Sequence, residues 1–216
     1  MDWFADFPGE TGPYMWISLA NMGLTIAGIA LFAYRFRWVW LFPIATTIAF
    51  LSLSIQAQGI RTSFGPVLTL AVCIYGLWRW QLYKDGATAS IPLRHAYPVE
   101  WGIAAGLLIL FTLITGFAGF ELLSFVGPGY VLSSLLSSLP LVMYLGFAHG
   151  IFESWYVGAA FGALNLASLA VLVPAPPAAF AYTAVVLGLY VFGLLKWRAA
   201  LNHQGRLAPV AHPAGS

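Results

Sequence analysis

The chain has 216 residues, of which 61% are hydrophobic and only 7% are charged, and its formal net charge is +2. A soluble domain carries roughly 25% charged residues, so this composition argues against a soluble protein and indicates a polytopic protein of the lipid bilayer. The small net charge gives no reason to expect a nucleic acid partner. A single cysteine, Cys73, excludes a disulfide framework.

The first segment, residues 1–15, is predicted to lie on the extracytoplasmic side of the membrane. It contains three acidic residues, Asp2, Asp6 and Glu10, and no lysine or arginine. A secretory signal begins with a basic region, so this segment is not expected to be one.

Seven stretches of the sequence are long and apolar enough to cross the roughly 30 Å hydrocarbon layer. In chain order they are Trp16–Tyr34, Trp38–Gln56, Phe64–Trp80, Trp101–Phe120, Tyr130–Ala148, Trp155–Val173 and Ala178–Trp197. Backbone groups cannot remain unpaired in lipid, so each stretch is predicted to be a transmembrane helix. Basic and Gly/Pro-rich segments separate them, and the one long polar connection runs from Lys84 to Glu100.

The basic residues predict the orientation of these helices. Eight of them fall on one side of the predicted topology: Arg35, Arg37, Arg79, Lys84, Arg94, Lys196, Arg198 and Arg206. Only Arg61 falls on the other side. We therefore predict a multi-pass protein of the cell (inner or plasma) membrane, with its N-terminus outside and its C-terminus in the cytoplasm.

Three residues of the first half recur in the second half at one interval. Trp38, Gly76 and Trp80 recur as Trp155, Gly193 and Trp197, each 117 residues later. The sequence thus predicts an all-α membrane protein with a parallel 3+1+3 repeat. Its parts are a three-helix unit at 16–80, a connector with an inverting fourth helix at 81–129, a second unit at 130–198 and a cytoplasmic tail at 199–216.

Short motifs in this order resemble those of the PnuC family of nicotinamide riboside transporters. They are Thr25-Ile26-Ala27-Gly28, Tyr75-Gly76-Leu77-Trp78-Arg79-Trp80, Glu153-Ser154-Trp155 and Gly193-Leu194-Leu195-Lys196-Trp197, within about residues 16 to 198. The resemblance implies a fold like that of the SWEET sugar carriers and facilitated diffusion of a vitamin. It also implies a cytosolic kinase that traps the substrate and a possible homotrimer.

Several polar positions differ from the family pattern. The second tryptophan of the family's sixth helix is Gly158 here and its asparagine is Gly162, while Asn165 lies three residues later on the same face. Cys73 stands in place of an asparagine, and Ser133 stands at an acidic position of the fifth helix. The scaffold implied by the resemblance is unaffected, whereas the substrate stays open.

No Asp, Glu, Lys or Arg lies within the interior of a predicted span, so uncharged side chains are the candidates for a substrate site. Eight residues are selected: Trp155, Asn165, Ser168, Tyr182, Gln56, Asn21, Ser133 and Ser137. The two aromatic ones offer a ring face on which a flat cationic heterocycle gains roughly 0.5–2 kcal/mol. The alternative roles are a helix–helix contact for the polar residues and a membrane-interface anchor for the tryptophan.

His149 and Glu153 are four residues apart and are expected to face one another in a local hydrogen bond or loop contact. Two such residues are too few for a metal site, and no Gly-x-x-x-x-Gly-Lys motif indicates ATP use. The spans also contain no paired nucleophile and base. We therefore predict no metal, no cofactor and no enzymatic activity.

The uncharged spans favour passive carriage over ion- or proton-coupled carriage. The leading prediction is a facilitated-diffusion transporter for a small vitamin or nucleoside-like solute, with nicotinamide riboside as the first candidate. The alternatives are a thiamine, riboflavin or sugar carrier of the same fold, and a non-transporting seven-helix sensor or assembly partner.

Overall fold

The computed structural model describes residues 13–58, 64–83, 91–119, 128–171 and 177–207. Over these residues the chain forms seven α-helices and one 3₁₀ turn, and no strand. The helices are α1 (Pro13–Ala33), α2 (Leu41–Gln58), α3 (Phe64–Leu82), α4 (Pro98–Gly119), α5 (Pro128–Ala148), α6 (Ser154–Val171) and α7 (Pro177–Leu207), and the 3₁₀ turn η1 (Arg37–Trp40) precedes α2. The predicted all-α fold is confirmed.

Prolines mark where several of these helices begin. α1, α4, α5 and α7 each start at a proline, a position where the missing N–H costs nothing and the fixed φ suits a helix. In the described part of the chain, two helices contain an apolar stretch that is long enough to cross a membrane, Trp16–Ala33 in α1 and Pro177–Gln204 in α7. α7 has 31 residues and continues to Leu207, beyond the predicted end of the last span at Trp197.

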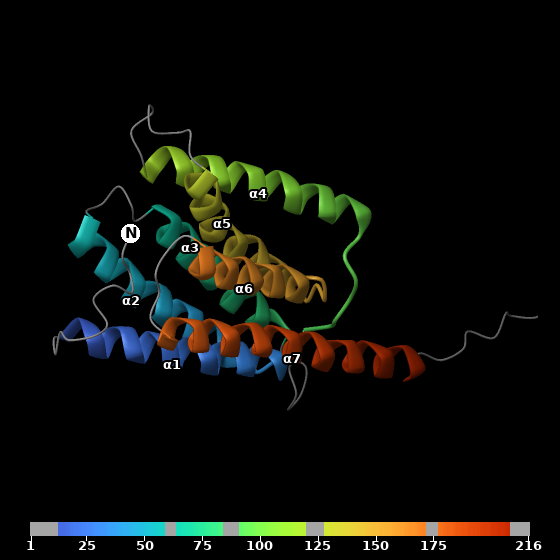
Figure 1. Ribbon diagram of the computed structural model, residues 1–216. Helices are drawn as coiled ribbons and strands as arrows, with labels where there is room; N and C mark the ends of the chain where they lie inside the picture. Colours follow the sequence, from blue (N-terminus) through green and yellow to red (C-terminus); the bar gives the residue numbers. More distant parts are fainter. Residues whose placement is uncertain (1–12, 59–63, 84–90, 120–127, 172–176, 208–216) are drawn as a thin grey trace, which may run out of the picture.

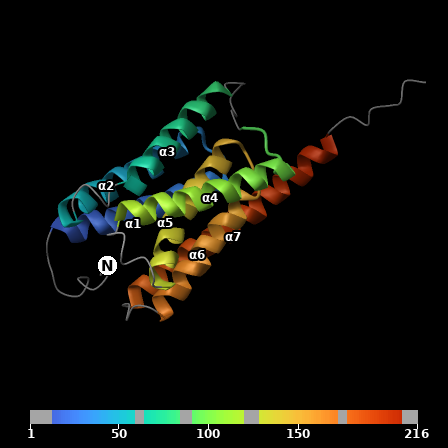
Figure 2. The same ribbon diagram turned by 90° about the horizontal axis from the view of Figure 1, so that it is seen from above.

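Six helices form a closed ring in the order α1, α2, α3, α5, α6 and α7, each in contact with the next and the last in contact with the first. α4 lies outside this ring, where it packs chiefly on α5. Figure 1 shows α1 and α7 side by side along one edge of the molecule and α4 along the opposite edge, and Figure 2 shows the same arrangement from above. The segments 16–80 and 130–198, which the sequence predicts to be repeat units, therefore meet along two seams, α1 with α7 and α3 with α5.

One end of the bundle is filled by six aromatic side chains, Phe32, Trp40, Trp80, Phe147, Trp155 and Trp197, none of them more than 2% exposed. We call them the aromatic cluster. In its first half, ring centroids are 5.0 Å apart for Phe32–Trp40 and 5.7 Å for Trp40–Trp80. In its second half they are 4.7 Å apart for Phe147–Trp155 and 5.6 Å for Trp155–Trp197.

The two halves of the aromatic cluster join where Phe32 and Phe147 stack, with centroids 5.1 Å apart and planes 23° apart. Aromatic pairs in such geometries contribute about 0.5–1.5 kcal/mol beyond the area they bury. The cluster therefore connects the two units at this end of the bundle.

Two tryptophans of the cluster also bond across the seams. The Trp80 indole on α3 donates its N–H to the backbone oxygen of Phe147 near the end of α5, at 3.1 Å. The Trp197 indole on α7 donates to the backbone oxygen of Phe32 near the end of α1, also at 3.1 Å. Each of these carbonyls also accepts from a backbone N–H of the turn that follows its own helix, so each unit supplies a second donor to a helix end of the other.

The turns that follow α1 and α5 have matching backbone hydrogen bonds. The bonds from Tyr34, Arg35 and Phe36 to Leu31 and Phe32 correspond to those from His149, Gly150 and Ile151 to Gly146 and Phe147, 115 residues later. Arg35 and Gly150, at equivalent points, both have positive φ angles, 55° and 67°. Glycine adopts this conformation without strain, whereas arginine does not.

The tryptophan that matches Trp155 in the structure is Trp40 and not Trp38. The Trp40 ring lies against Gly76 just as the Trp155 ring lies against Gly193, while Trp38 is 43% exposed with the Arg37 guanidinium over its ring. The sequence comparison paired Trp38 with Trp155 because it assumed a constant interval of 117 residues between the two halves. The segment from tryptophan to glycine is two residues shorter in the first unit, so the interval there is 115.

Candidate functional site

Trp155, the aromatic residue singled out from the sequence, lies inside the aromatic cluster. It is fully buried, and its ring covers Gly193 of α7 so closely that a Cβ at that position would overlap it. Its indole nitrogen has no hydrogen-bond partner in the described part of the chain, and neither has that of Trp40. Trp155 therefore packs between helices and is not exposed as a membrane-interface anchor.

Asn21 and Tyr182 come together on the seam between α1 and α7. The Tyr182 side chain interacts with Thr25 of α1, and the Thr25 hydroxyl donates to the backbone oxygen of Asn21 at 2.8 Å. The side-chain oxygen of Asn21 is buried and has no hydrogen-bond partner among the described residues. At a rise of 1.5 Å per residue, these groups lie about 10–22 Å along their helices from the aromatic cluster.

Asn165 and Ser168 lie on α6, where both are partly buried. The Ser168 hydroxyl donates to the backbone oxygen of Asn165 at 2.8 Å, a local bond within the helix. Within the described residues, no hydrogen bond joins this pair to the Asn21–Tyr182 group.

The remaining predicted residues lie on α2 and α5. Ser137 is exposed on α5, whereas its neighbour Ser138 is buried and donates to the backbone oxygen of Ser134 at 2.7 Å. The side chains of Gln56 and Ser133 lie outside the described part of the structure. Ser134 and Ser138 therefore serve helix packing rather than an open path.

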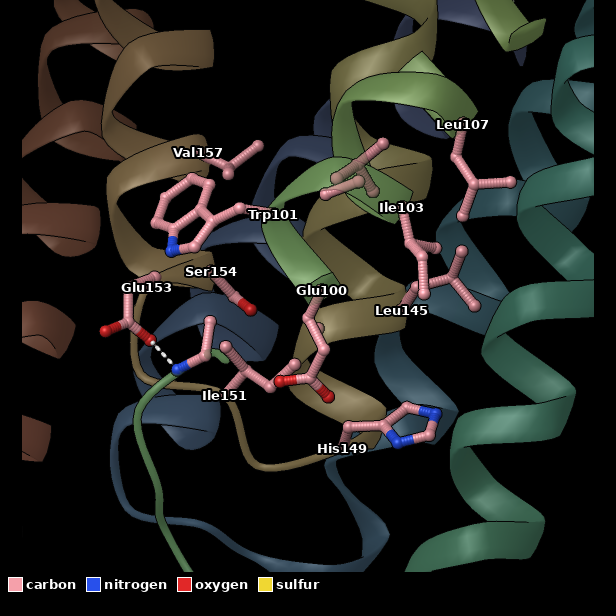
Figure 3. A pocket seen from close by; sticks show the side chains of 14 residues that line it. Glu100, Trp101, Ile103, Leu107, Leu145, His149, Ile151, Glu153, Ser154 and Val157 are labelled. Atoms are coloured by element: carbon pink, nitrogen blue, oxygen red, sulfur yellow. Dashed lines mark hydrogen bonds between the residues drawn. The ribbon is translucent and has the colours of Figure 1, made fainter. Parts of the chain in front are cut away.

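A partly open cavity of about 230 Å³ lies between α4 and the α5–α6 pair, and none of the eight predicted residues is among those that line it. Its walls are mainly apolar side chains of α4, α5 and α6, such as Ile103, Leu107, Leu145 and Val157, and polar side chains stand at one end (Figure 3). Glu100, His149, Glu153 and Ser154 form that end, which adjoins the turn after α5.

The carboxylates at this end are held by the connector that leads into α4. Arg94 pairs with Glu100 through two N–O contacts of 2.6 and 2.5 Å, and Glu100 also accepts from the backbone N–H of Tyr97 at 2.8 Å. These interactions lower the pKa of Glu100 to about 2, with the Arg94 hydrogen bond the largest cause. Glu153 accepts from Ala96 N–H at 2.9 Å, drawn in Figure 3, and meets His95 Nδ1 at 2.8 Å.

Backbone hydrogen bonds fix the same connector to the turn after α5. Arg94 donates to Gly150 at 3.1 Å and accepts from Phe152 at 3.0 Å. A side chain at Gly150 would overlap the backbone oxygen of Pro92. The connector therefore docks on the second unit and positions both carboxylates.

The expected contact between His149 and Glu153 is not the one that forms. Glu153 turns to His95, whereas the His149 ring meets the Tyr75 hydroxyl of α3 at 3.1 Å. Burial, with Arg79 and Arg94 nearby, lowers the pKa of His149. No group of three or more His, Cys, Asp or Glu side chains in the described ranges is placed to hold a metal ion.

The family described as nicotinamide mononucleotide transporter matches residues 15–199. The chain belongs to this family. A search among curated proteins found no match.

Among solved structures, the crystal structure of the vitamin B3 transporter PnuC matches with a TM-score of 0.66 and 13% sequence identity. The match covers 87% of this chain and 83% of that chain, so the two share a fold. Family and fold confirm the resemblance found in the sequence, and they confirm a membrane transporter of the vitamin type that is not an enzyme.

Two tyrosines next to the aromatic cluster, Tyr190 and Tyr144, are not among the residues selected from the sequence. Tyr190 is buried beside Trp155, with ring centroids 6.4 Å apart, and it corresponds to Cys73 at the 117-residue interval. Tyr144 lies 6.1 Å from both Phe32 and Trp40. The repeat signalled Tyr190, but nothing in the sequence signalled the cavity beside α4, because the outer position of α4 depends on tertiary packing.

Proposed function

We propose that this protein carries a small, phosphate-free vitamin by facilitated diffusion, with nicotinamide riboside as the leading substrate. The observation that carries the proposal is the family match over residues 15–199. The Asn21–Thr25–Tyr182 group supports it, because an unpaired buried amide oxygen beside a tyrosine suits a solute that donates hydrogen bonds. Trp155, Asn165, Ser168, Gln56, Ser133 and Ser137 remain proposed members of the site.

Passive carriage follows from the distribution of charge. The spans contain no Asp, Glu, Lys or Arg at membrane depth, and Lys196, near the cluster end of α7, lies over the Tyr34 ring at 4.2 Å. A coupled carrier uses an ionisable group at depth to bind its driving ion. The proposed transport therefore needs no gradient other than that of the substrate.

The same lack of charge favours a riboside over a mononucleotide. A phosphate group buried within the bundle needs a cation or several donors to offset its desolvation. The Asn21–Thr25–Tyr182 group offers uncharged side chains only. A pyridinium ring without a phosphate is compatible with such a site and gains from an aromatic face.

We also propose that the bundle is a parallel 3+1+3 repeat of the SWEET type, crossing the membrane seven times with its N-terminus outside. The paired aromatic contacts, the reciprocal Trp80 and Trp197 bonds and the matching turns after α1 and α5 support this architecture. The position of α4 outside the ring is consistent with an inverting helix between two units. A homotrimer and trapping by a cytosolic kinase belong to the proposal through the family.

Uptake into proteoliposomes tests the function. Labelled nicotinamide riboside, nicotinamide mononucleotide, thiamine and riboflavin are compared, with a protonophore and with no sodium present. We expect the riboside to equilibrate across the membrane regardless of either condition and the mononucleotide to stay outside. Equal, background-level uptake of all four compounds would remove the vitamin assignment.

A pair of tyrosine variants gives this assay a matched control. Tyr182→Phe removes the hydroxyl that faces Thr25, whereas Tyr156→Phe removes one from a residue that is 49% exposed on α6. One lost hydrogen bond corresponds to about a fivefold weaker uptake at low substrate. We expect that loss in Tyr182→Phe only.

The same uptake assay can reveal two alternative functions. A labelled sugar panel in the same vesicles identifies a sugar carrier of this fold. A sensor or assembly partner would show no uptake of any solute, although the protein folds and inserts.

A further inference from the structure

The cavity beside α4 is continuous with the apolar outer surface of that helix. Trp101 and Ile103 line the cavity and are also 48% and 55% exposed, and Ile109, Leu110 and Leu113 extend the exposed apolar face along α4. In a membrane protein such a face contacts lipid chains. A chain that enters the cavity from this face meets the apolar side chains of Leu107, Leu145 and Val157.

The two ends of the cavity differ in polarity in the way that the two ends of a lipid do. Glu100, Glu153 and Ser154 stand at the end where α4 begins, beside Trp101, a residue type that favours the headgroup level. From Glu100 to Leu107 the α4 wall extends about 10 Å, a third of the roughly 30 Å hydrocarbon layer. The cavity therefore has room for the first part of an acyl chain below a headgroup.

The polar end favours an amine. The Arg94 guanidinium offsets the charge of the Glu100 carboxylate. The Glu153 carboxylate bonds to the backbone N–H of Ala96 and to His95, and its pair with His95 is ionic only when the imidazole is protonated. His149, the other titratable group at this end, bonds to Tyr75. Arg94 also interacts electrostatically with Glu153, but its direct ion pair is with Glu100, so two carboxylates share one permanent cation at this end. The remaining negative charge suits a primary ammonium and disfavours an anionic headgroup.

Ser154 adds a polar group to the wall of the cavity. The residue is only 4% exposed, it lines the cavity, and its hydroxyl oxygen lies against Gly146 of α5. Figure 3 shows this side chain directed toward the space beside Glu100. A serine hydroxyl in this position can donate to an ester or phosphate oxygen of a lipid.

We propose that this cavity is a binding site for one glycerophospholipid with a primary-amine headgroup, phosphatidylethanolamine, whose ammonium group bonds to Glu153 while an acyl chain lies along α4. The lipid would then fasten α4 and its connector to α5 and α6 on the outer side of the ring. This site is separate from the proposed transport path, so its test uses no transport substrate.

The test measures lipid binding to the purified full chain in nanodiscs. Discs of phosphatidylcholine are doped with phosphatidylethanolamine or with anionic phosphatidylglycerol, and both the thermal midpoint and the lipid retained in native mass spectrometry are recorded. We expect one retained phosphatidylethanolamine per chain, preferred over phosphatidylcholine by about tenfold, as one charge-assisted hydrogen bond allows. Equal retention of the two lipids, or preference for phosphatidylglycerol, overturns the proposal.

Variants locate the site. Ala104→Trp fills the cavity, whereas Ala105→Trp adds the same bulk at an exposed position of the same helix that does not line the cavity. We expect only the first to lose the retained lipid and the rise in thermal midpoint, and equal behaviour of the two contradicts the site. If Ala104→Trp does not fold, Glu153→Gln decides, because it keeps the cavity but must abolish the preference for the amine headgroup. A preference that survives in Glu153→Gln overturns the proposal.

Discussion

Two glycines, Gly76 and Gly193, give the aromatic cluster its close packing. Each faces the ring of a tryptophan in its own unit, Trp40 and Trp155, and neither site has room for a Cβ. Because these rings are fully buried, they have no free space to move into. The two positions are thus as tightly restricted as the tryptophans themselves.

Alanine at either glycine should therefore destabilise the protein. We expect Gly76→Ala and Gly193→Ala each to cost about 1–3 kcal/mol, the usual cost of overpacking a core. Gly23→Ala on α1 is the matched control, since nothing lies within 4 Å of the added Cβ. Thermal midpoints in one detergent measure the effect, and a loss at Gly23 equal to that at Gly193 would refute this explanation.

The reciprocal indole bonds allow a second comparison between residues of the same type. Trp197→Phe and Trp155→Phe remove equal volumes from fully buried positions, but only the first removes an indole donor from the Phe32 carbonyl, which keeps its bond from the Arg35 N–H. We expect Trp197→Phe to cost about 0.6–1.7 kcal/mol more, the range of hydrogen bonds within membrane bundles. Unfolding midpoints of the two variants decide it, and equal values would mean that the bond adds no stability.

At the scale of elements, the positions of the helices in the sequence could be predicted, but which helices pack against one another could not. Long apolar runs and prolines such as Pro128 and Pro177 placed all seven helices close to their observed bounds, because length and composition suffice for that. The break at η1 and the extension of α7 to Leu207 depend on packing and on exposed residues beyond the apolar run. Ring order is likewise a property of contacts between distant helices.

The candidate site shows the same division. Composition pointed to uncharged groups such as Asn21 and Tyr182, and the structure places these two on adjacent helices. The sequence could not show that Asn165 and Ser168 pair locally on α6, nor that Glu153 turns to His95. The hydrogen-bond partner of each side chain depends on which helix or connector lies next to it in the fold. Spacing along the chain carries no such information.

The connector into α4 gives a prediction about pH. The pKa of Glu100 is lowered in the fold from 4.5 to about 2, so its pairing with Arg94 contributes fully above pH 4.5 and is lost as the pH falls through about 2. The pair is partly exposed, so its contribution is on the order of 1 kcal/mol or less. The thermal midpoint of the wild type should fall across this window more steeply than that of Glu100→Gln. Parallel curves for the two proteins would show that the pair does not stabilise the fold.

At the scale of the whole molecule, the orientation in the membrane is directly testable. The only cysteine, Cys73, is buried, so engineered cysteines can be labelled against a low background. Gln204→Cys, exposed near the end of α7, should react with an impermeant reagent only in inside-out vesicles. Glu10→Cys, in the segment predicted outside, should react only in right-side-out vesicles. Reaction of both from one side would mean an even number of crossings and would end the parallel-repeat proposal.

The bond between Trp197 and Phe32 has a consequence for biosynthesis. The two residues are 165 positions apart, so at roughly 5–20 residues per second the ribosome delivers the indole about 10–30 s after the first helix has emerged. During that interval the Phe32 carbonyl has only the backbone N–H of Arg35 as a donor, although the helix has already entered the bilayer. The end of α1 therefore gains its second hydrogen bond only when the last helix arrives, so this part of the seam between α1 and α7 closes late in biosynthesis.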